Sequence, residues 1–256
     1  MATFVIVHGA HSGGWIWQLV RNRLWAQGHI CFTPTLTGVG ERAHLARIGV
    51  DLDLHIHDIV SVFHYEDLTE VILVGHSYGG MVITGVADRV PERIARLIYL
   101  DTIVPSNGQS VLDLAPPALR TALERMVQRN EDGALVLPPL PEQHHGRIGP
   151  GGPSSEEIRQ RLAWRVPVAF ATFTQPLRLT NAAAVQAIPH CYIHCTDKGP
   201  DDVYASVAQQ AREWGWPVLE LATGHLPQLT TPEELSALLI EMARGEDEKK
   251  QWKHLE

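Results

Sequence analysis

The sequence is short of basic residues, and it contains no long hydrophobic run. Its 21 Lys and Arg residues are outnumbered by 29 Asp and Glu, which gives a formal net charge of −8 at pH 7. A chain with this balance offers no positive field to hold a phosphate backbone, so we expect no nucleic-acid partner. No window approaches the roughly 18 apolar residues that a membrane span requires, so we expect no membrane partner either.

The beginning of the chain lacks a basic leader and a small-residue cleavage site. Met1 is followed almost at once by the apolar run of residues 4–7, which is not the pattern of a secretory signal. The three cysteines, Cys31, Cys191 and Cys195, form neither an even set nor a C-x-x-C pair, and each lies in a strand-like run. We therefore expect reduced, buried thiols and a cytoplasmic protein.

What the chain does contain is a regular alternation of strand-like and helix-like segments. Short runs of β-branched and aliphatic residues alternate with segments whose apolar residues recur at helical spacing. The alternation predicts an α/β fold, with a mostly parallel central sheet and helices on both faces. The predicted strands are residues 3–8, 30–36, 71–75, 95–103, 191–195 and 217–222, and the predicted helices are residues 15–27, 53–65, 78–89, 203–214 and 232–243.

One long segment breaks this alternation with proline clusters and a Gly-Pro-Gly-Gly-Pro turn, and it contains helical pieces near residues 119–129 and 155–164. Ligands of open parallel sheets bind outside the carboxyl ends of the strands. An insertion that leaves the strand ending near Ile103 would therefore cover such a site as a helical cap. We predict a core of residues 1–104 and 190–245, a cap of residues 105–189 and a disordered tail of residues 246–256.

The most informative motif is Val-Ile-Leu-Val-Gly-His-Ser-Tyr-Gly-Gly-Met, which runs from Val71 to Met81. A serine set between glycines, where a buried strand gives way to a helix, is typical of a nucleophile elbow. Gly75 and Gly79 have no Cβ to collide with the neighbouring strand and helix in such a sharp turn. The motif therefore predicts that Ser77 is a catalytic nucleophile.

A serine hydroxyl is a weak nucleophile at neutral pH, so it needs a base and an acid that orients the base. His225 follows the last predicted strand in Thr-Gly-His-Leu-Pro, where the last member of a Ser, Asp, His order belongs. We predict that His225 is the base. Asp197 lies between the serine and the histidine in the sequence, at the end of a predicted strand, and is our choice for the acid.

Three other aspartates compete with Asp197 for this role. Asp101 also lies at the end of a predicted strand, and its carboxylate could approach the histidine from there. Asp201 and Asp202 are weaker candidates, because acidic residues at that point suit the start of the following helix.

The oxyanion formed during acyl transfer needs two backbone donors. One is the amide of Tyr78, the residue after the nucleophile. The other is expected from the loop after the first strand, where Gly9 lets the amide of Ala10 turn inward. Each donor stabilises the transition state by about 2.7–4 kcal/mol.

A histidine-rich stretch at residues 55–58 superficially resembles a metal site. Side chains one or two positions apart on a helix point away from each other, and no partner ligands follow at suitable spacing. We therefore expect no metal and no cofactor. The candidates for the substrate pocket are residues of the oxyanion loop and of the insertion, which would suit an apolar acyl or alcohol group: His11, Trp164, Phe170 and Phe173.

These motifs resemble the α/β-hydrolases, and more narrowly the branch of the plant methylesterases and hydroxynitrile lyases. The likeness rests on His-Gly-Ala at residues 8–10, on the elbow, on Cys-Thr-Asp-Lys-Gly at residues 195–199 and on Gly-His at residues 224–225. The resemblance implies the same roles as the chain positions: nucleophile Ser77, acid Asp197, base His225, and oxyanion amides Ala10 and Tyr78.

Two departures separate this chain from the lyases of that branch. The lyases carry a threonine where this chain has Gly9, and a lysine directly after the histidine where it has Leu226. We therefore expect a cofactor-independent serine hydrolase that cleaves a small, apolar carboxylic ester through an acyl-enzyme. A carbon–carbon lyase and a non-catalytic ligand receptor on the same fold are the alternatives. A homodimer is left open.

Overall fold

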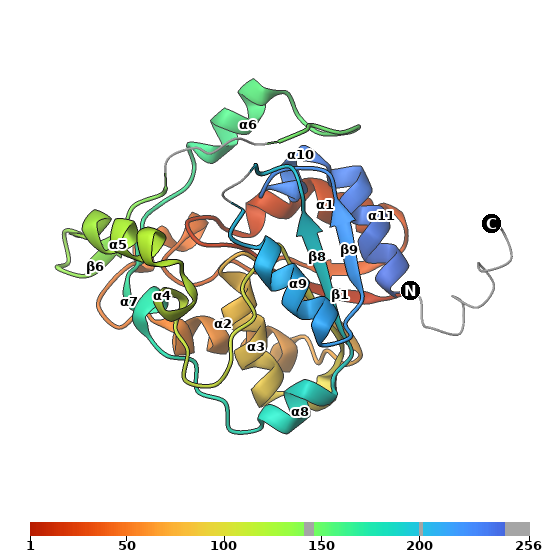
Figure 1. Ribbon diagram of the computed structural model, residues 1–256, viewed down its shortest axis with the longest axis horizontal. Helices are drawn as coiled ribbons and strands as arrows, with labels where there is room; N and C mark the ends of the chain where they lie inside the picture. The colour runs from red at the N-terminus through yellow and green to blue at the C-terminus, as the bar shows by residue number, and fades with distance from the viewer. Residues whose placement is uncertain (141–145, 200–201, 244–256) are drawn as a thin grey trace, which may run out of the picture.

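The computed structural model describes residues 1–140, 146–199 and 202–243. The predicted disordered tail of residues 246–256 lies outside the described residues. Six parallel strands form the central sheet in the order β2-β1-β3-β4-β8-β9 (Figure 1). The predicted α/β fold with a mostly parallel sheet is confirmed. The strands are β1 (Thr3–Val7), β2 (Ile30–Phe32), β3 (Val71–His76), β4 (Ile94–Leu100), β8 (His190–Cys195) and β9 (Val218–Leu221).

Helices cover both faces of this sheet, because successive strand residues point to opposite sides. In β1, Val5 joins one apolar cluster with α2, α3 and α9, and Ile6 joins another with α1 and α11. All six residues of β3 are buried, which explains its continuous apolar sequence. The helices of the core are α1 (Gln18–Ala26), α2 (Leu52–Tyr65), α3 (Gly79–Arg89), α9 (Ala205–Glu213), α10 (Pro227–Thr230) and α11 (Pro232–Ala243), with 3-10 turns at Gly14–Trp17, Gly40–Leu45 and Pro91–Arg93.

Two predicted strands are too long by three or more residues at their carboxyl ends. The strand predicted to reach residue 36 ends at Phe32, and the one predicted to reach residue 103 ends at Leu100. In the second case the backbone of Asp101 turns into the left-handed region, with a φ of 43°. This turn ends the strand and gives the Asp101 side chain a direction that a continued strand would not.

The segment between β4 and β8 contains short elements of both kinds. Three of its strands form a small antiparallel sheet in the order β5-β6-β7, which the sequence did not reveal because strands of two or three residues show no alternation. The elements are α4 (Val111–Leu114), α5 (Pro117–Met126), β5 (Gln128–Arg129), β6 (Leu135–Leu137), α6 (Ser155–Leu162), β7 (Val168–Ala169), α7 (Ala171–Thr174) and α8 (Ala182–Ala187).

Parts of this segment lie at both ends of the sheet. In Figure 1, α6 lies toward the end to which the arrowheads of β8 and β9 point, whereas α8 lies at the opposite end, below α3. The residues after α6 hydrogen-bond to the loop after β1, through Val166 N and His11 O at 3.0 Å. Asp88, near the end of α3, holds the other part by accepting from the amides of Thr180 and Asn181.

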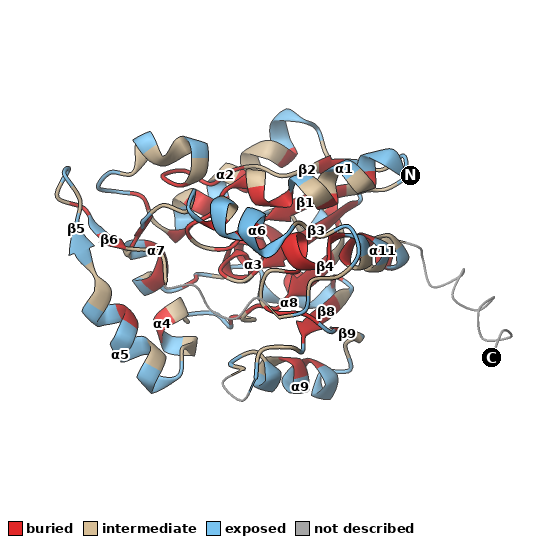
Figure 2. Cartoon of the chain, turned by 90° about the horizontal axis from the view of Figure 1, so that it is seen from above, coloured by how far each residue is buried: buried red, intermediate tan, exposed pale blue. Residues whose placement is uncertain are grey.

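Burial follows this layered arrangement. Figure 2 shows buried residues concentrated along the sheet and on the inward faces of the helices, while the outer faces of α5, α6 and α9 are exposed. None of the described helices is both long and apolar enough to cross a membrane.

Candidate active site

Ser77 lies at the sharp turn between β3 and α3. Its φ is 55°, a left-handed conformation that is costly for a residue with a side chain. Glycines flank the turn because a Cβ on Gly75 would lie 2.7 Å from the Gly79 carbonyl oxygen, and a Cβ on Gly79 would lie 2.6 Å from the Val7 carbonyl oxygen. The motif therefore folds as the elbow that the sequence predicts.

His225 lies in the loop between β9 and α10, and its Nε2 is 3.0 Å from the Ser77 Oγ. The His76 side chain supports this loop through its Nε2, which is 2.7 Å from the His225 carbonyl oxygen. Burial lowers the pKa of His76 to about 3, so the ring is neutral and the proton on Nε2 makes this bond. The structure thus brings the predicted nucleophile and base together, although they are 148 positions apart in the chain.

The other ring nitrogen of His225 contacts Asp101. The distance from His225 Nδ1 to Asp101 Oδ2 is 2.6 Å, and the Asp101 side chain is fully buried. Its other oxygen, Oδ1, accepts from the amide of Cys195 at 3.1 Å and from Lys198 Nζ at 2.5 Å. Burial alone would raise the pKa of Asp101, but the hydrogen bond and charge of His225 and the charge of Lys198 outweigh it and lower that pKa. Asp101 is therefore ionised at neutral pH.

The prediction that Asp197 contacts the base is wrong. The amide of Asp197 donates to the Thr223 carbonyl oxygen at 2.9 Å, and its carboxylate accepts from the amide of Arg147 at 2.8 Å. β4 and β8 are adjacent parallel strands, so aspartates after either strand end at the same edge of the sheet. The left-handed turn at Asp101 brings that carboxylate to His225, whereas Asp197 holds a residue of the insertion.

The two weaker candidates for the acid do not contact the base among the described residues. Asp202 accepts from Lys198 Nζ at 2.7 Å and pairs with His194 Nε2 at 2.7 Å. Asp201 lies outside the described residues.

One predicted oxyanion donor, the amide of Tyr78, belongs to the elbow, and the other, the amide of Ala10, belongs to the loop after β1. Gly9 lies against the nucleophile, since a Cβ at this position would be 2.9 Å from the Ser77 Cβ. Among the described residues, both amides are left without a protein acceptor.

His8, which the sequence did not single out, orients this loop. Its Nε2 accepts from the Leu36 amide at 3.1 Å, so its Nδ1 carries the proton and donates to the Gly9 carbonyl oxygen at 2.7 Å. Burial lowers the pKa of His8 to about 4, which keeps the ring neutral. Because a trans peptide points its C=O and N–H in opposite directions, this bond directs the Ala10 amide away from His8.

Two buried aromatic rings stack on each other, and one of them belongs to the residue after the nucleophile. The Tyr78 ring stacks on Phe173, with centroids 5.8 Å apart and planes 5° from parallel. The Tyr78 hydroxyl bonds to His55 Nδ1 at 3.0 Å, and His55 Nε2 donates to the Thr37 carbonyl oxygen at 2.8 Å. Both ring nitrogens of His55 are therefore engaged by protein groups. The described residues contain no group of three or more His, Cys, Asp or Glu that could hold a metal ion.

The four predicted pocket residues lie in different places. Phe173 lies against Tyr78, and His11 follows Ala10 and binds the Val166 carbonyl oxygen through its Nδ1 at 3.1 Å. Phe170 precedes α7 and packs at the edge of the larger apolar cluster. Trp164 is 58% exposed and belongs to another pocket, so the prediction that it lines the Ser77 site is not supported.

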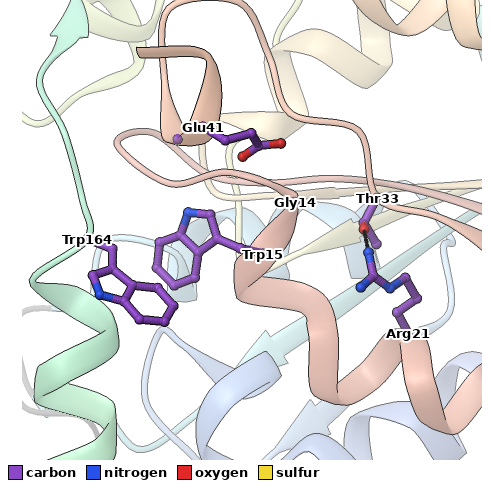
Figure 3. A pocket seen from close by; sticks show the side chains of 7 residues that line it. Gly14, Trp15, Arg21, Thr33, Glu41 and Trp164 are labelled. Carbon is purple, nitrogen blue, oxygen red and sulfur yellow. Dashed lines mark hydrogen bonds between the residues drawn. The ribbon is translucent and has the colours of Figure 1, made fainter. Parts of the chain in front are cut away.

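Figure 3 shows this second pocket, whose volume is about 530 Å³. Trp164 meets Trp15 edge to face there, with centroids 5.4 Å apart. Its lining contains none of the residues around Ser77: it consists of Gly14, Trp15, Arg21, Thr33, Gly40, Glu41 and Trp164.

Sequence reasoning also missed two residues that touch the site, Lys198 and Tyr204. The Tyr204 ring stacks on His225, with centroids 5.1 Å apart and planes 12° from parallel. Lys198 Nζ lies 4.7 Å from the centre of that ring. One signal was available, because Lys198 is the only lysine among residues 1–248.

Comparisons with known proteins show the family of this chain. A model described as the alpha/beta hydrolase family matches residues 4–238. The carbendazim hydrolyzing esterase of Nocardioides sp. (strain SG-4G) is 37% identical over 246 residues, which cover 93% of this chain and 98% of that protein. Methylesterase 1 of Arabidopsis thaliana is 34% identical over 265 residues, which cover 94% of this chain and 95% of that protein.

A solved structure supports the fold independently. An extracellular alpha/beta-hydrolase from a Paenibacillus species superposes with a TM-score of 0.81 at 24% sequence identity, covering 96% of this chain and 100% of that one. The resemblance seen in the sequence is confirmed. The chain belongs to the alpha/beta hydrolase family, in its methylesterase-like branch.

Proposed function

We propose that this protein is a serine esterase, in which Ser77 is the nucleophile, His225 the base and Asp101 the acid that orients the base. The observation that carries the proposal is the continuous chain of hydrogen bonds from Ser77 Oγ through both nitrogens of His225 to the buried Asp101. The relatives named as esterases support ester hydrolysis as the reaction.

In the first step the Ser77 Oγ attacks the ester carbonyl while His225 Nε2 takes the hydroxyl proton. The ionised Asp101 stabilises the resulting imidazolium and keeps the remaining proton on Nδ1. The amides of Ala10 and Tyr78 donate to the negative oxygen of the tetrahedral intermediate. The imidazolium then gives its proton to the departing alcohol, which leaves an acyl group on Ser77.

In the second step a water molecule attacks the acyl group, and His225 takes the proton of this water. Collapse of the second tetrahedral intermediate releases the acid and restores the serine hydroxyl. The proposed chemistry uses only protein groups and water.

We propose a small ester with an apolar or aromatic part as the substrate. The stacked rings of Tyr78, the residue after the nucleophile, and Phe173 make the surroundings of this part of the chain apolar. The relatives of this chain include a carbendazim esterase, a pyrethroid hydrolase and a methylesterase. A panel that contains carbendazim, a pyrethroid and methyl esters of aromatic acids, varied separately in the acid and in the alcohol, tests this choice.

The lyase alternative is disfavoured by two residues. A threonine in place of Gly9 would bring its Cβ against the Ser77 Cβ, and Leu226 offers no charge beside the base. Release of cyanide from mandelonitrile would support the lyase instead. The receptor alternative predicts no covalent reaction of Ser77 with a fluorophosphonate, whereas an esterase is labelled at that residue.

The proposal is tested by replacing the nucleophile. The Ser77→Ala variant is expected to lose at least about 10³-fold in kcat on a chromogenic short-chain ester, because the acyl-enzyme can no longer form. Circular dichroism and the thermal unfolding midpoint serve as the folding control. Turnover at the wild-type rate by a folded Ser77→Ala protein would remove the assignment.

A further inference from the structure

The segment that follows β8 contacts two members of the proposed triad, the acid and the base. Lys198 Nζ binds Asp101 Oδ1 at 2.5 Å, and the Tyr204 ring stacks on His225. Burial raises the pKa of the Tyr204 phenol, so this side chain is neutral beside the base. We call Lys198, Asp202, Tyr204 and His194 the Lys198 cluster.

Lys198 lies between two carboxylates. Its side chain is only 11% exposed, and its Nζ is 2.5 Å from Asp101 Oδ1 and 2.7 Å from Asp202 Oδ1. Asp202 is fixed in turn, because its oxygens accept from the Tyr204 amide at 2.9 Å and pair with His194 Nε2 at 2.7 Å. The ammonium group therefore has a defined place and a countercharge on each side.

The choice of lysine at this position is specific. Every other basic residue of residues 1–248, histidine aside, is an arginine. An ammonium group is a compact point charge that can bind two carboxylate oxygens at once, whereas a guanidinium is a wide planar fork. A single nitrogen bridging Asp101 and Asp202 needs the first of these two shapes.

The carboxylate of Asp101 needs such a partner for two physical reasons. A fully buried carboxylate without a countercharge is strongly disfavoured, and Asp101 has no exposed surface. In addition, Lys198 and the Cys195 amide occupy Oδ1 and so leave Oδ2 for His225 Nδ1. The same contacts therefore stabilise the ionised form of the Asp101 carboxylate and fix its orientation.

We propose that Lys198 is a positioning residue that keeps Asp101 ionised and turned toward His225, and thereby sets the pH range in which the base works. Asp202 and Tyr204 brace Lys198 in this role. The inference rests on the proposed esterase function. Within the part of the chain that the structure describes, the titratable groups that interact electrostatically with Asp101 are those of His76, Tyr192, Cys195, Lys198, Tyr204 and His225.

The sign of the effect follows from the charges. Only the neutral imidazole of His225 can accept the serine proton, and a nearby ammonium group disfavours the imidazolium. Without Lys198 the imidazolium is favoured up to a higher pH, so the acidic limb of the pH–rate profile is expected to move upward by about one pH unit. A carboxylate free to rotate also lowers the plateau rate, by about tenfold to a hundredfold.

The experiment measures the rate of Ser77 labelling by a fluorophosphonate between pH 5 and 9. In this reaction the Ser77 Oγ–P bond forms, the P–F bond breaks with release of fluoride, and His225 takes the hydroxyl proton, so the rate reports the base without any choice of ester substrate. The variants are Lys198→Met, which removes the charge, and Lys198→Arg, which keeps it. Arg212→Met is the matched control, because it removes an exposed cation of α9 that pairs with Glu220 at 2.6 Å and touches no triad residue.

The expected result has three parts. Lys198→Met labels more slowly, with its acidic limb about one unit higher. In Lys198→Arg the acidic limb of the pH–rate profile returns toward its wild-type position. The plateau rate recovers only in part, because a guanidinium does not fit between Asp101 and Asp202 as a single nitrogen does. Arg212→Met has the wild-type profile.

The inference would be overturned if the acidic limb of the pH–rate profile had the wild-type position in folded Lys198→Met. It would also be overturned if Arg212→Met shifted that limb equally. Asp202→Asn is the second variant if Lys198→Met does not fold, and it is expected to lower the plateau because it releases one side of the ammonium group. A wild-type plateau and limb in Asp202→Asn would count equally against the role. Failure of the proposed function is distinguishable, since it would appear as absent labelling of the wild-type protein.

Discussion

The ends of β4 and β8 differ in one decisive way, although the two strands lie side by side and point in the same direction. Each strand is followed by an aspartate at the same edge of the sheet. Asp101 is fully buried, has a φ of 43° and contacts the base. Asp197 is partly exposed and holds the amide of Arg147 in the insertion. Position at a strand end identifies both aspartates as candidates for the triad acid. The backbone turn and the countercharge then favour Asp101 over Asp197.

The segment after β8 contributes a different group to the proposed active site. Its aspartate does not supply the acid, but its lysine binds the acid that β4 supplies. Two adjacent strand ends thus both contribute to orienting His225. The end of β4 supplies the carboxylate, and the segment after β8 supplies the cation that binds it.

The largest expected difference between the two strand ends is in the kcat of variants at their aspartates. Asp101→Asn should lower kcat by about 10⁴-fold on a chromogenic ester, because the base loses the group that fixes its tautomer. Asp197→Asn should stay within about threefold of the wild type, since its carboxylate contacts a backbone amide of the insertion. Steady-state kinetics of the two folded variants at one pH make the comparison. The opposite order of activities would mean that the two aspartates have been assigned the wrong way round.

A double-mutant cycle sharpens the same comparison. Lys198→Met is expected to slow the enzyme about tenfold or more when Asp101 is present, and to have little further effect in the Asp101→Asn background, because the two residues act as one unit. In the Asp197→Asn background its effect should be undiminished. Equal effects of Lys198→Met in all three backgrounds would contradict a coupling through Asp101.

Stability at acid pH gives the third contrast. The pKa of Asp101 is lowered in the folded protein, so its ionisation contributes stability that is present above the unfolded-state pKa and is lost as the pH falls through the folded-state value. Asp101→Asn removes this contribution, so its unfolding free energy should fall less steeply than that of the wild type below about pH 4. Urea unfolding at a series of pH values measures the slope. Parallel curves for the two proteins would argue against an ionised Asp101.

The smallest effect is expected at Asp197. Asp197→Ala removes one exposed hydrogen bond to the insertion, which should lower the unfolding free energy by about 0.5–1.5 kcal/mol and leave kcat nearly unchanged. Chemical denaturation and an esterase assay on the same preparation measure both quantities. A large loss of activity without a loss of stability would give Asp197 a role that its contacts do not suggest.

Much of the core was predictable because its signals are local. The buried run of β3, the glycines at positions 75 and 79 and the glycine before His225 each act within a few residues of the chain. The mostly parallel sheet was expected from the alternation of strands and helices, and the pairing of Ser77 with His225 was expected because nucleophile and base must both lie at strand ends. The loop that carries Ala10 was predictable for the same reason.

The rest depends on contacts that the sequence does not encode locally. The choice between Asp101 and Asp197 rests on a left-handed turn and on a lysine that arrives from another strand end. The three short strands of the insertion have too few residues to show a period. The sequence does not tell where Trp164 packs, because an aromatic residue of an insertion can pack against any of several loops, and this one meets Trp15.

The most direct test is the environment of His225 Nδ1 in a crystal structure of the fluorophosphonate-labelled protein. We predict that Nδ1 lies about 2.6 Å from Asp101 Oδ2, with Lys198 on Oδ1 and Asp197 on the amide of Arg147. A His225 Nδ1 bonded to Asp197, with Asp101 turned away, would contradict the account.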